Sequence, residues 1–123
     1  MRIAAALLAC TVLAGCQTGS SPAPVAATDE AHDVSIALAD AMKKCWFSGD
    51  SAFADYVYAP EVVAGNPRIL IVPRSEPGGR PALVIEPRSR AVVNAYGPLL
   101  GTGLAPRISA DLNRWKTGVS ACV

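Results

Sequence analysis

The chain has 123 residues and a formal net charge of +1, from 11 lysines and arginines against 10 aspartates and glutamates. This length predicts one small domain, and the balanced charge excludes a general nucleic-acid binder, which needs a basic surface. One histidine and four cysteines offer few ligands for zinc, so we expect neither a metal site nor a cofactor.

The first sixteen residues have the pattern of an export signal. Met1-Arg2 precedes a mainly apolar run from Ile3 to Ala14. This run is too short to cross a hydrocarbon core of about 30 Å, which favours a signal peptide over a transmembrane helix. It ends in Leu13-Ala14-Gly15-Cys16, which resembles the lipobox of bacterial lipoproteins. Cys10, which follows two leucines and an alanine, fits that pattern less well.

The resemblance covers only these residues, but its implications are specific. It implies that the signal peptide, residues 1–15, is removed and that Cys16 becomes the first residue of the mature chain, carrying acyl chains such as palmitate. Two or three acyl chains suffice for stable membrane attachment. Gln17, in place of aspartate, favours the outer over the inner membrane by resemblance to enterobacterial lipoproteins. The implied location is the bacterial cell envelope, lipid-anchored and facing the periplasm; ordinary secretory cleavage is the alternative.

The segment after the signal predicts a flexible tether. Residues 16–28 are the lipidated cysteine followed by small, uncharged residues that include Pro22 and Pro24, a composition with too little apolar surface to fold. A dozen extended residues reach about 40 Å. The single domain, residues 29–123, is therefore expected to work close to its membrane.

Two cysteines, Cys45 and Cys122, follow the lipobox. An even pair in an exported protein predicts a disulfide, because the compartment is oxidising.

Two amphipathic helices are predicted, one at each end of the domain. The first begins at Thr28 or Asp29 and ends near Phe47, and the second runs from about Ala105 to Lys116. Each has apolar residues at the helical period of 3.6. In the first they are Val34, Leu38, Ala41, Met42 and Cys45; in the second they are Leu104, Ile108, Leu112, Trp115 and Val119.

Between the helices, runs of β-forming residues alternate with proline- and glycine-containing turns. The predicted strands are Tyr56–Tyr58, ended by Pro60, then Arg68–Val72, Ala82–Glu86 and Arg90–Tyr96. Arg68–Val72 is apolar on both faces after its first residue, which favours an interior position. The fold class expected is α+β: a two-layer domain with an antiparallel sheet of three or four strands and a helix at each end of the chain.

Charge is unevenly distributed along the domain. Residues 29–61 carry seven acids and two lysines, whereas residues 62–123 carry eight basic side chains and three acids. One explanation is that the two halves pack together and neutralise each other. The other is an anionic-ligand patch at the sheet edges, because arginine binds phosphate and carboxylate well. Its candidate residues are Arg74, Arg80, Arg88 and Arg90.

No catalytic constellation is evident. Gly49-Asp50-Ser51 resembles the nucleophile block of GDSL-type hydrolases, but His32 lies upstream and no histidine follows to activate the serine. We interpret this segment as a helix stop and turn. A glycosidase-like pair of carboxylates is the other enzymatic possibility, with Glu61, Glu76 and Glu86 as candidates.

Two classes of function remain. The favoured one is a non-catalytic envelope lipoprotein that binds a protein partner, or an anionic component such as lipid or peptidoglycan, beside the membrane. The alternative is a small envelope hydrolase that uses carboxylates. An open sheet face with arginines and tyrosines would favour binding, and a pocket with two converging acids would favour the enzyme.

Overall fold

The computed structural model describes residues 29–63 and 65–123, and it has the predicted α+β fold with two helices and a four-stranded antiparallel sheet. The predicted signal peptide, Cys16 and the tether lie outside the described residues. In chain order the elements are α1 (Asp29–Cys45), η1 (Ser51–Phe53), β1 (Tyr56–Val63), β2 (Asn66–Pro73), β3 (Leu83–Pro87), β4 (Val93–Tyr96), η2 (Pro98–Gly101) and α2 (Ala105–Trp115).

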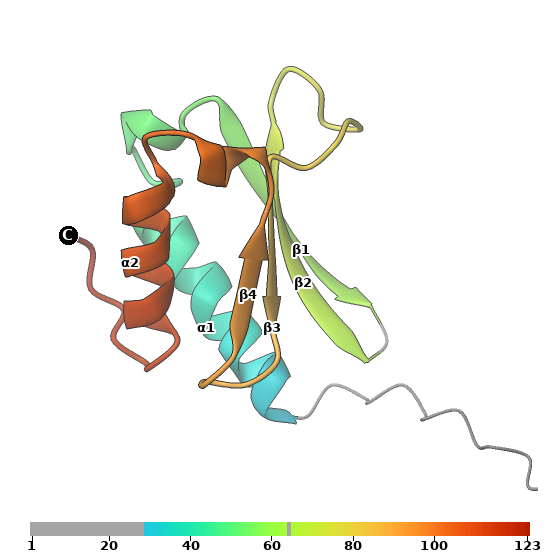
Figure 1. Cartoon of the computed structure of the whole chain (residues 1–123), viewed down its shortest axis with the longest axis vertical. Helices are drawn as coiled ribbons and strands as arrows, with labels where there is room; N and C mark the ends of the chain where they lie inside the picture. The colour runs from blue at the N-terminus through green and yellow to red at the C-terminus, as the bar shows by residue number, and fades with distance from the viewer. Residues whose placement is uncertain (1–28, 64) are drawn as a thin grey trace, which may run out of the picture.

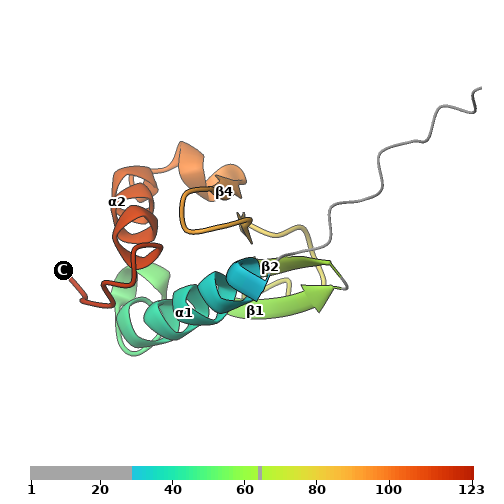
Figure 2. The ribbon, with the colours of Figure 1, turned by 90° about the horizontal axis from the view of Figure 1, so that it is seen from below.

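The strands follow one another across the sheet in the order β1-β2-β3-β4, and every neighbouring pair is antiparallel. Both helices lie on one side of this sheet (Figures 1 and 2). The register places Ile69 opposite Ile85, and Ile71 opposite Leu83. All four side chains are fully buried, so this face of the sheet forms the core with the helices.

Helix α1 forms for the reasons that its sequence predicts. Acidic residues occupy its first turn and Lys43 and Lys44 its last, which complements the helix dipole. Val34, Leu38 and Met42 are buried on one face. The helix ends at Cys45, and the next residue, Trp46, is fully buried.

Three predictions about the limits of elements are wrong. The last strand does not begin at Arg90, because residues 88–92 form the β3–β4 turn and β4 begins at Val93. Strand β1 does not end at Pro60 but continues through it to Val63, with Pro60 opposite Ile69. Proline is tolerated there because β1 is an edge strand, where a missing N–H need not break a ladder on both sides. Val119 was expected on the buried stripe of the second helix, but α2 ends at Trp115 and Val119 is 49% exposed.

The chain passes very close to itself where it leaves the sheet. Gly97 has φ +139°, and a Cβ atom there would lie 2.5 Å from the carbonyl oxygen of Ala82. The amide of Leu99 donates a hydrogen bond of 2.9 Å to that same oxygen. Only glycine fits this approach, and it holds the segment before η2 against the start of β3.

A disulfide joins Cys45, at the end of α1, to Cys122, with 5.3 Å between the Cα atoms. The predicted pairing is confirmed. The carbonyl oxygen of Ala121 also accepts hydrogen bonds from Arg114 Nε and Trp115 Nε1, each 3.2 Å long. These contacts hold the segment after α2 against both helices.

The disulfide closes a loop of 77 residues in sequence. Replacing Cys122 with serine should lower the free energy of unfolding by about 4–5 kcal/mol on the chain-entropy model, measured by chemical denaturation. The wild-type protein treated with a thiol reductant is the matched control and should show the same loss. An unchanged denaturation midpoint in both samples would contradict a stabilising role.

Candidate functional site

The side of the sheet opposite the helices, called here the open face, is not covered by either described helix. Because side chains alternate along a strand and the register is known, the residues that it presents follow directly. They are Val57, Ala59 and Glu61 on β1, Asn66, Arg68, Leu70 and Val72 on β2, Val84 and Glu86 on β3, and Asn94 and Tyr96 on β4.

The charged side chains of the open face are bound to one another. Arg68 Nη2 lies 2.7 Å from Glu61 Oε2. The Tyr96 hydroxyl donates a hydrogen bond of 2.8 Å to Glu86 Oε1, while Arg88 Nη2 lies 3.1 Å from Glu86 Oε2. The bond to Glu86 raises the pKa of the Tyr96 phenol above its ordinary value of 10.0. These contacts fix the positions of the side chains before any ligand arrives.

The four candidate arginines do not form one patch. Arg74 and Arg80 lie in the β2–β3 connection, at the end of the sheet where η2 begins. Arg88 and Arg90 lie in the β3–β4 turn at the opposite end, where the Arg90 amide donates a hydrogen bond of 3.2 Å to Glu30 at the start of α1. Figure 1 shows the two connections at opposite ends of the domain.

The surroundings of the four differ as well. Arg74 donates from Nε to the carbonyl oxygen of Ala54, and Arg88 binds Glu86 and Asn66. The guanidinium groups of Arg80 and Arg90 have no hydrogen-bond or ion-pair partner among residues 29–63 and 65–123. Each end of the sheet thus has one arginine of this set whose guanidinium group makes no described hydrogen bond or ion pair.

A hollow of about 520 Å³, called here the distal groove, lies beside Arg80 on the open face. Its walls are mainly apolar and include three prolines and an aromatic ring. The lining residues are Pro73, Arg80, Pro81, Ala82, Val84, Tyr96, Gly97 and Pro98. The ring is half exposed, since Tyr96 retains 49% of its accessible surface. An apolar surface with a cation beside it suits a ligand that carries both an apolar group and an anion.

A buried acid lies on the other side of the sheet, between the helices. Asp111 on α2 is only 4% exposed. Its Oδ2 accepts a hydrogen bond of 2.7 Å from Trp46 Nε1, and Oδ1 is paired with Arg114. Arg107 Nε lies 3.6 Å from Oδ2. Two hydrogen bonds, one to each carboxylate oxygen, together with the nearby charge of Arg107 make this buried acid tolerable, although Arg107 Nε itself has no hydrogen-bond partner in the described residues.

Aromatic rings stack beside this acid. Trp46 and Phe53 are nearly parallel, with centroids 4.5 Å apart, and Trp115 tilts against Trp46 at 5.0 Å. Arg107 lies over Phe53 and Arg114 over Trp115. Rings and guanidinium groups thus form a continuous stack that joins the end of α1, η1 and α2.

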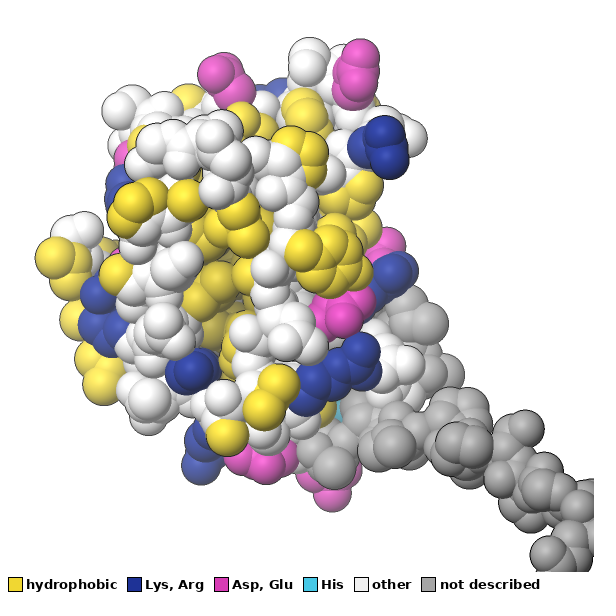
Figure 3. Space-filling view, in the orientation of Figure 1, with side chains coloured by type: hydrophobic (Ala, Val, Ile, Leu, Met, Phe, Trp, Pro, Cys, Tyr) yellow, Lys and Arg dark blue, Asp and Glu magenta, His cyan; other side chains and the backbone are white. Residues whose placement is uncertain are grey.

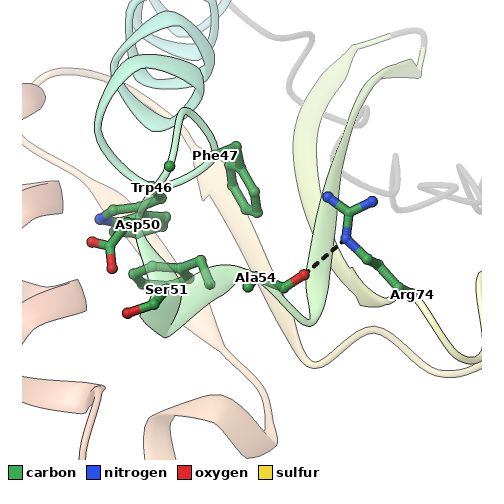
Figure 4. Close-up of a pocket in the computed structure, with 8 residues that line it drawn as sticks. Trp46, Phe47, Asp50, Ser51, Ala54 and Arg74 are labelled. Atoms are coloured by element: carbon green, nitrogen blue, oxygen red, sulfur yellow. Dashed lines mark hydrogen bonds between the residues drawn. The ribbon is translucent and has the colours of Figure 1, made fainter.

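A pocket of about 270 Å³ lies next to this stack, lined in part by Asp50, Ser51 and Arg74 (Figure 4). Both carboxylate oxygens of Asp50 are engaged in contacts within the protein. Oδ1 accepts from the Ala52 amide at 2.9 Å, and Oδ2 is paired with Arg107. The bond from Arg107, with help from the Ala52 amide, lowers the pKa of Asp50 below its ordinary 3.8. Asp50 caps η1, in agreement with a helix stop and turn rather than a nucleophile block.

The carboxylates considered for a hydrolase do not converge on a pocket. Glu61 is paired with Arg68, and Glu86 is paired with Arg88 and Tyr96. Glu76 is exposed in the β2–β3 connection. The hollows beside Arg74 and Arg80 contain none of the three. This geometry gives no support to acid–base catalysis.

Sequence reasoning missed two features. Asp111 and Trp46 form a buried pair 65 residues apart in sequence. The available signal was that Asp111, three residues after Ile108, falls on the apolar side of the second helix. The second feature is the Tyr96–Glu86 contact, which needed the register of β3 and β4 and had no signal in the sequence alone.

No protein-family model, curated protein or solved structure matches the chain. Neither α1 nor α2, the helices of the described part of the chain, has the length and hydropathy of a membrane span. In the same residues, no group of three or more histidine, cysteine, aspartate or glutamate side chains could hold a metal ion.

The role of Asp111 can be tested by substitution. Asp111→Ala should lower the free energy of unfolding by about 3–5 kcal/mol, because it removes the acceptor of the Trp46 indole N–H and of Arg114 Nη2 and breaks a buried ion pair. The exposed Asp40 on α1 offers a control, since Asp40→Ala should change stability by less than about 0.5 kcal/mol. Equal effects of the two substitutions in denaturant titrations would show that the Asp111 contacts do not stabilise the fold.

Proposed function

We propose that the protein is a non-catalytic lipoprotein of the bacterial cell envelope. It is attached to the membrane, with the outer membrane favoured, through acyl chains on Cys16 and binds a partner on the periplasmic side. Leu13-Ala14-Gly15-Cys16 supports the anchor. The disulfide between Cys45 and Cys122 agrees with an oxidising compartment.

The observation that carries the binding function is the open face. Both helices cover the other side of the sheet (Figure 2), and the open face keeps a half-exposed tyrosine and ordered ion pairs. Side chains that are already fixed lose little conformational entropy when a ligand binds. The paired carboxylates argue against a hydrolase, and the pre-ordered surface supports recognition.

The position of the tether supports an orientation on the membrane. The tether joins the domain at Asp29, the first residue of α1. The β3–β4 turn, with Arg88 and Arg90, contacts this end of α1 through Glu30. These two arginines are therefore on the side nearer the anchor, where anionic lipid headgroups would meet them. The distal groove lies toward the other end of the domain.

The anchor is tested by mass spectrometry of the protein isolated from its own envelope. The intact mass should correspond to a chain that begins at Cys16 and carries acyl groups, and Cys16→Ser should remain as a precursor or leave the membrane fraction. An unmodified mass, or a chain that begins elsewhere, would refute the anchor and leave the properties of the domain untouched.

The orientation is tested by amide hydrogen exchange in the reconstituted lipoprotein. A basic residue near an anionic surface contributes about 1 kcal/mol, so exchange in the β3–β4 turn should slow about fivefold in phosphatidylglycerol vesicles relative to phosphatidylcholine vesicles. Arg90→Gln should remove this difference, and so should high salt. Arg80→Gln, at the opposite end, is the matched control and should preserve it. Equal exchange in the two lipids would overturn the orientation.

A further inference from the structure

We propose that the distal groove binds an extended segment of another envelope protein in which an apolar side chain lies next to a carboxylate. This inference rests on the proposed binding function and names the class of its partner. The volume of about 520 Å³ lies within the range of about 300–1,000 Å³ found for ligand sites. It is large enough for a few side chains of a peptide.

The groove is rigid on the side where the chain leaves the sheet. The close approach of Gly97 to Ala82, and the hydrogen bond from the Leu99 amide to the Ala82 carbonyl, hold the two segments together. Pro81 and Pro98, one in each segment, have fixed φ angles. A site that is built before the ligand arrives binds with a smaller entropic loss.

The aromatic wall is also held in place. The Tyr96 hydroxyl donates a hydrogen bond to Glu86 Oε1. Arg88 donates to the other carboxylate oxygen, Glu86 Oε2, and also to Asn66 Oδ1. Because this chain of contacts engages the hydroxyl, the part of Tyr96 left for a ligand is its ring. An aromatic ring beside prolines is the kind of surface on which extended peptide segments dock.

The positive charge of Arg80 indicates that the ligand carries a negatively charged group. Arg80 lines the groove and is exposed, and within the described residues its guanidinium has no acceptor. Glu61 and Glu86, the acids of the open face, are bound to other arginines. Glu76 belongs to the same connection as Arg80 but makes no ion pair with it in the described structure. A carboxylate from the ligand is therefore the partner that Arg80 lacks.

The position of the groove favours a protein over a lipid. Strand β3 begins at the groove and runs toward the β3–β4 turn, which contacts Glu30 at the end of the domain where the tether joins. The groove is thus turned away from the anchor. Figure 3 shows hydrophobic side chains gathered around the end of β4 where the chain leaves for η2.

Selection from a phage-displayed library of random heptapeptides, with the protein isolated from cells and kept in nonionic detergent, tests the proposal. The enriched peptides should combine apolar residues with aspartate or glutamate. Arg80→Gln should weaken binding of the best peptide about tenfold, as expected for loss of a hydrogen bond to a charged group, measured by fluorescence anisotropy. Arg80→Glu should shift the selection toward lysine and arginine.

Two further variants separate the groove from the rest of the surface. Tyr96→Ala should weaken peptide binding, and Arg90→Gln, which changes another exposed arginine at the other end, should not. No enrichment, or the same peptides selected by the wild-type protein and Arg80→Glu, would overturn the proposal. Arg80-dependent binding of phosphatidylglycerol vesicles without peptide binding would also overturn it. Because none of these measurements needs acylation, a failure here is distinct from a failure at Cys16.

Discussion

The buried carboxylate of Asp111 is the interaction on which the arrangement of this domain depends. An isolated carboxylate inside a protein is costly, so Asp111 is compatible with the fold only while Trp46, Arg107 and Arg114 surround it. Those partners come from the end of α1 and from α2 itself. Arg107 and Arg114 accompany Asp111 on α2, so the contact that depends on helix packing is the hydrogen bond from Trp46 Nε1, and a packing that separated α2 from Trp46 would leave one carboxylate oxygen without that donor.

A disulfide and a second ion pair near the end of α1 also hold the two helices in this arrangement. Trp46 is preceded by Cys45, whose disulfide to Cys122 returns the chain to the end of α1. Arg107 extends the network to Asp50 and so to η1. With both helices locked over one side of the sheet, the four strands have no other described helix to cover their second side. The open face is thus a consequence of how the core is assembled.

As a result, the two ends of the domain differ in the arginines and the groove that they carry. The end where α1 begins lies beside the β3–β4 turn with Arg88 and Arg90, and the other end carries the distal groove with Arg80. The arginines that looked like one group in the sequence are separated because β3 runs between them. This separation of the two arginine pairs is what the proposed orientation on a membrane rests on.

Much of the fold was predictable from local pattern. The helical period in residues 29–47 and 105–116 and the turn residues between the strands reflect chemistry within a few positions of each residue, so the α+β class and the four strand regions were predicted correctly. The disulfide was predictable because only Cys45 and Cys122 follow Cys16 in the sequence. Pro60 and Val119 were assigned wrongly, because a proline is tolerated in an edge strand and a periodic residue can lie beyond the end of its helix.

The sequence by itself determined the fold class, the approximate positions of the elements and the cysteine pairing, and it supplied the resemblance to a lipobox on which the proposed anchor rests. Only the tertiary structure decided that Trp46 and Asp111 meet, that Tyr96 binds Glu86, and that Arg80 is left beside an apolar groove while Arg90 lies at the opposite end. The physical reason is distance along the chain. These contacts join residues on different elements, and their partners depend on strand register and helix packing, which no local pattern encodes.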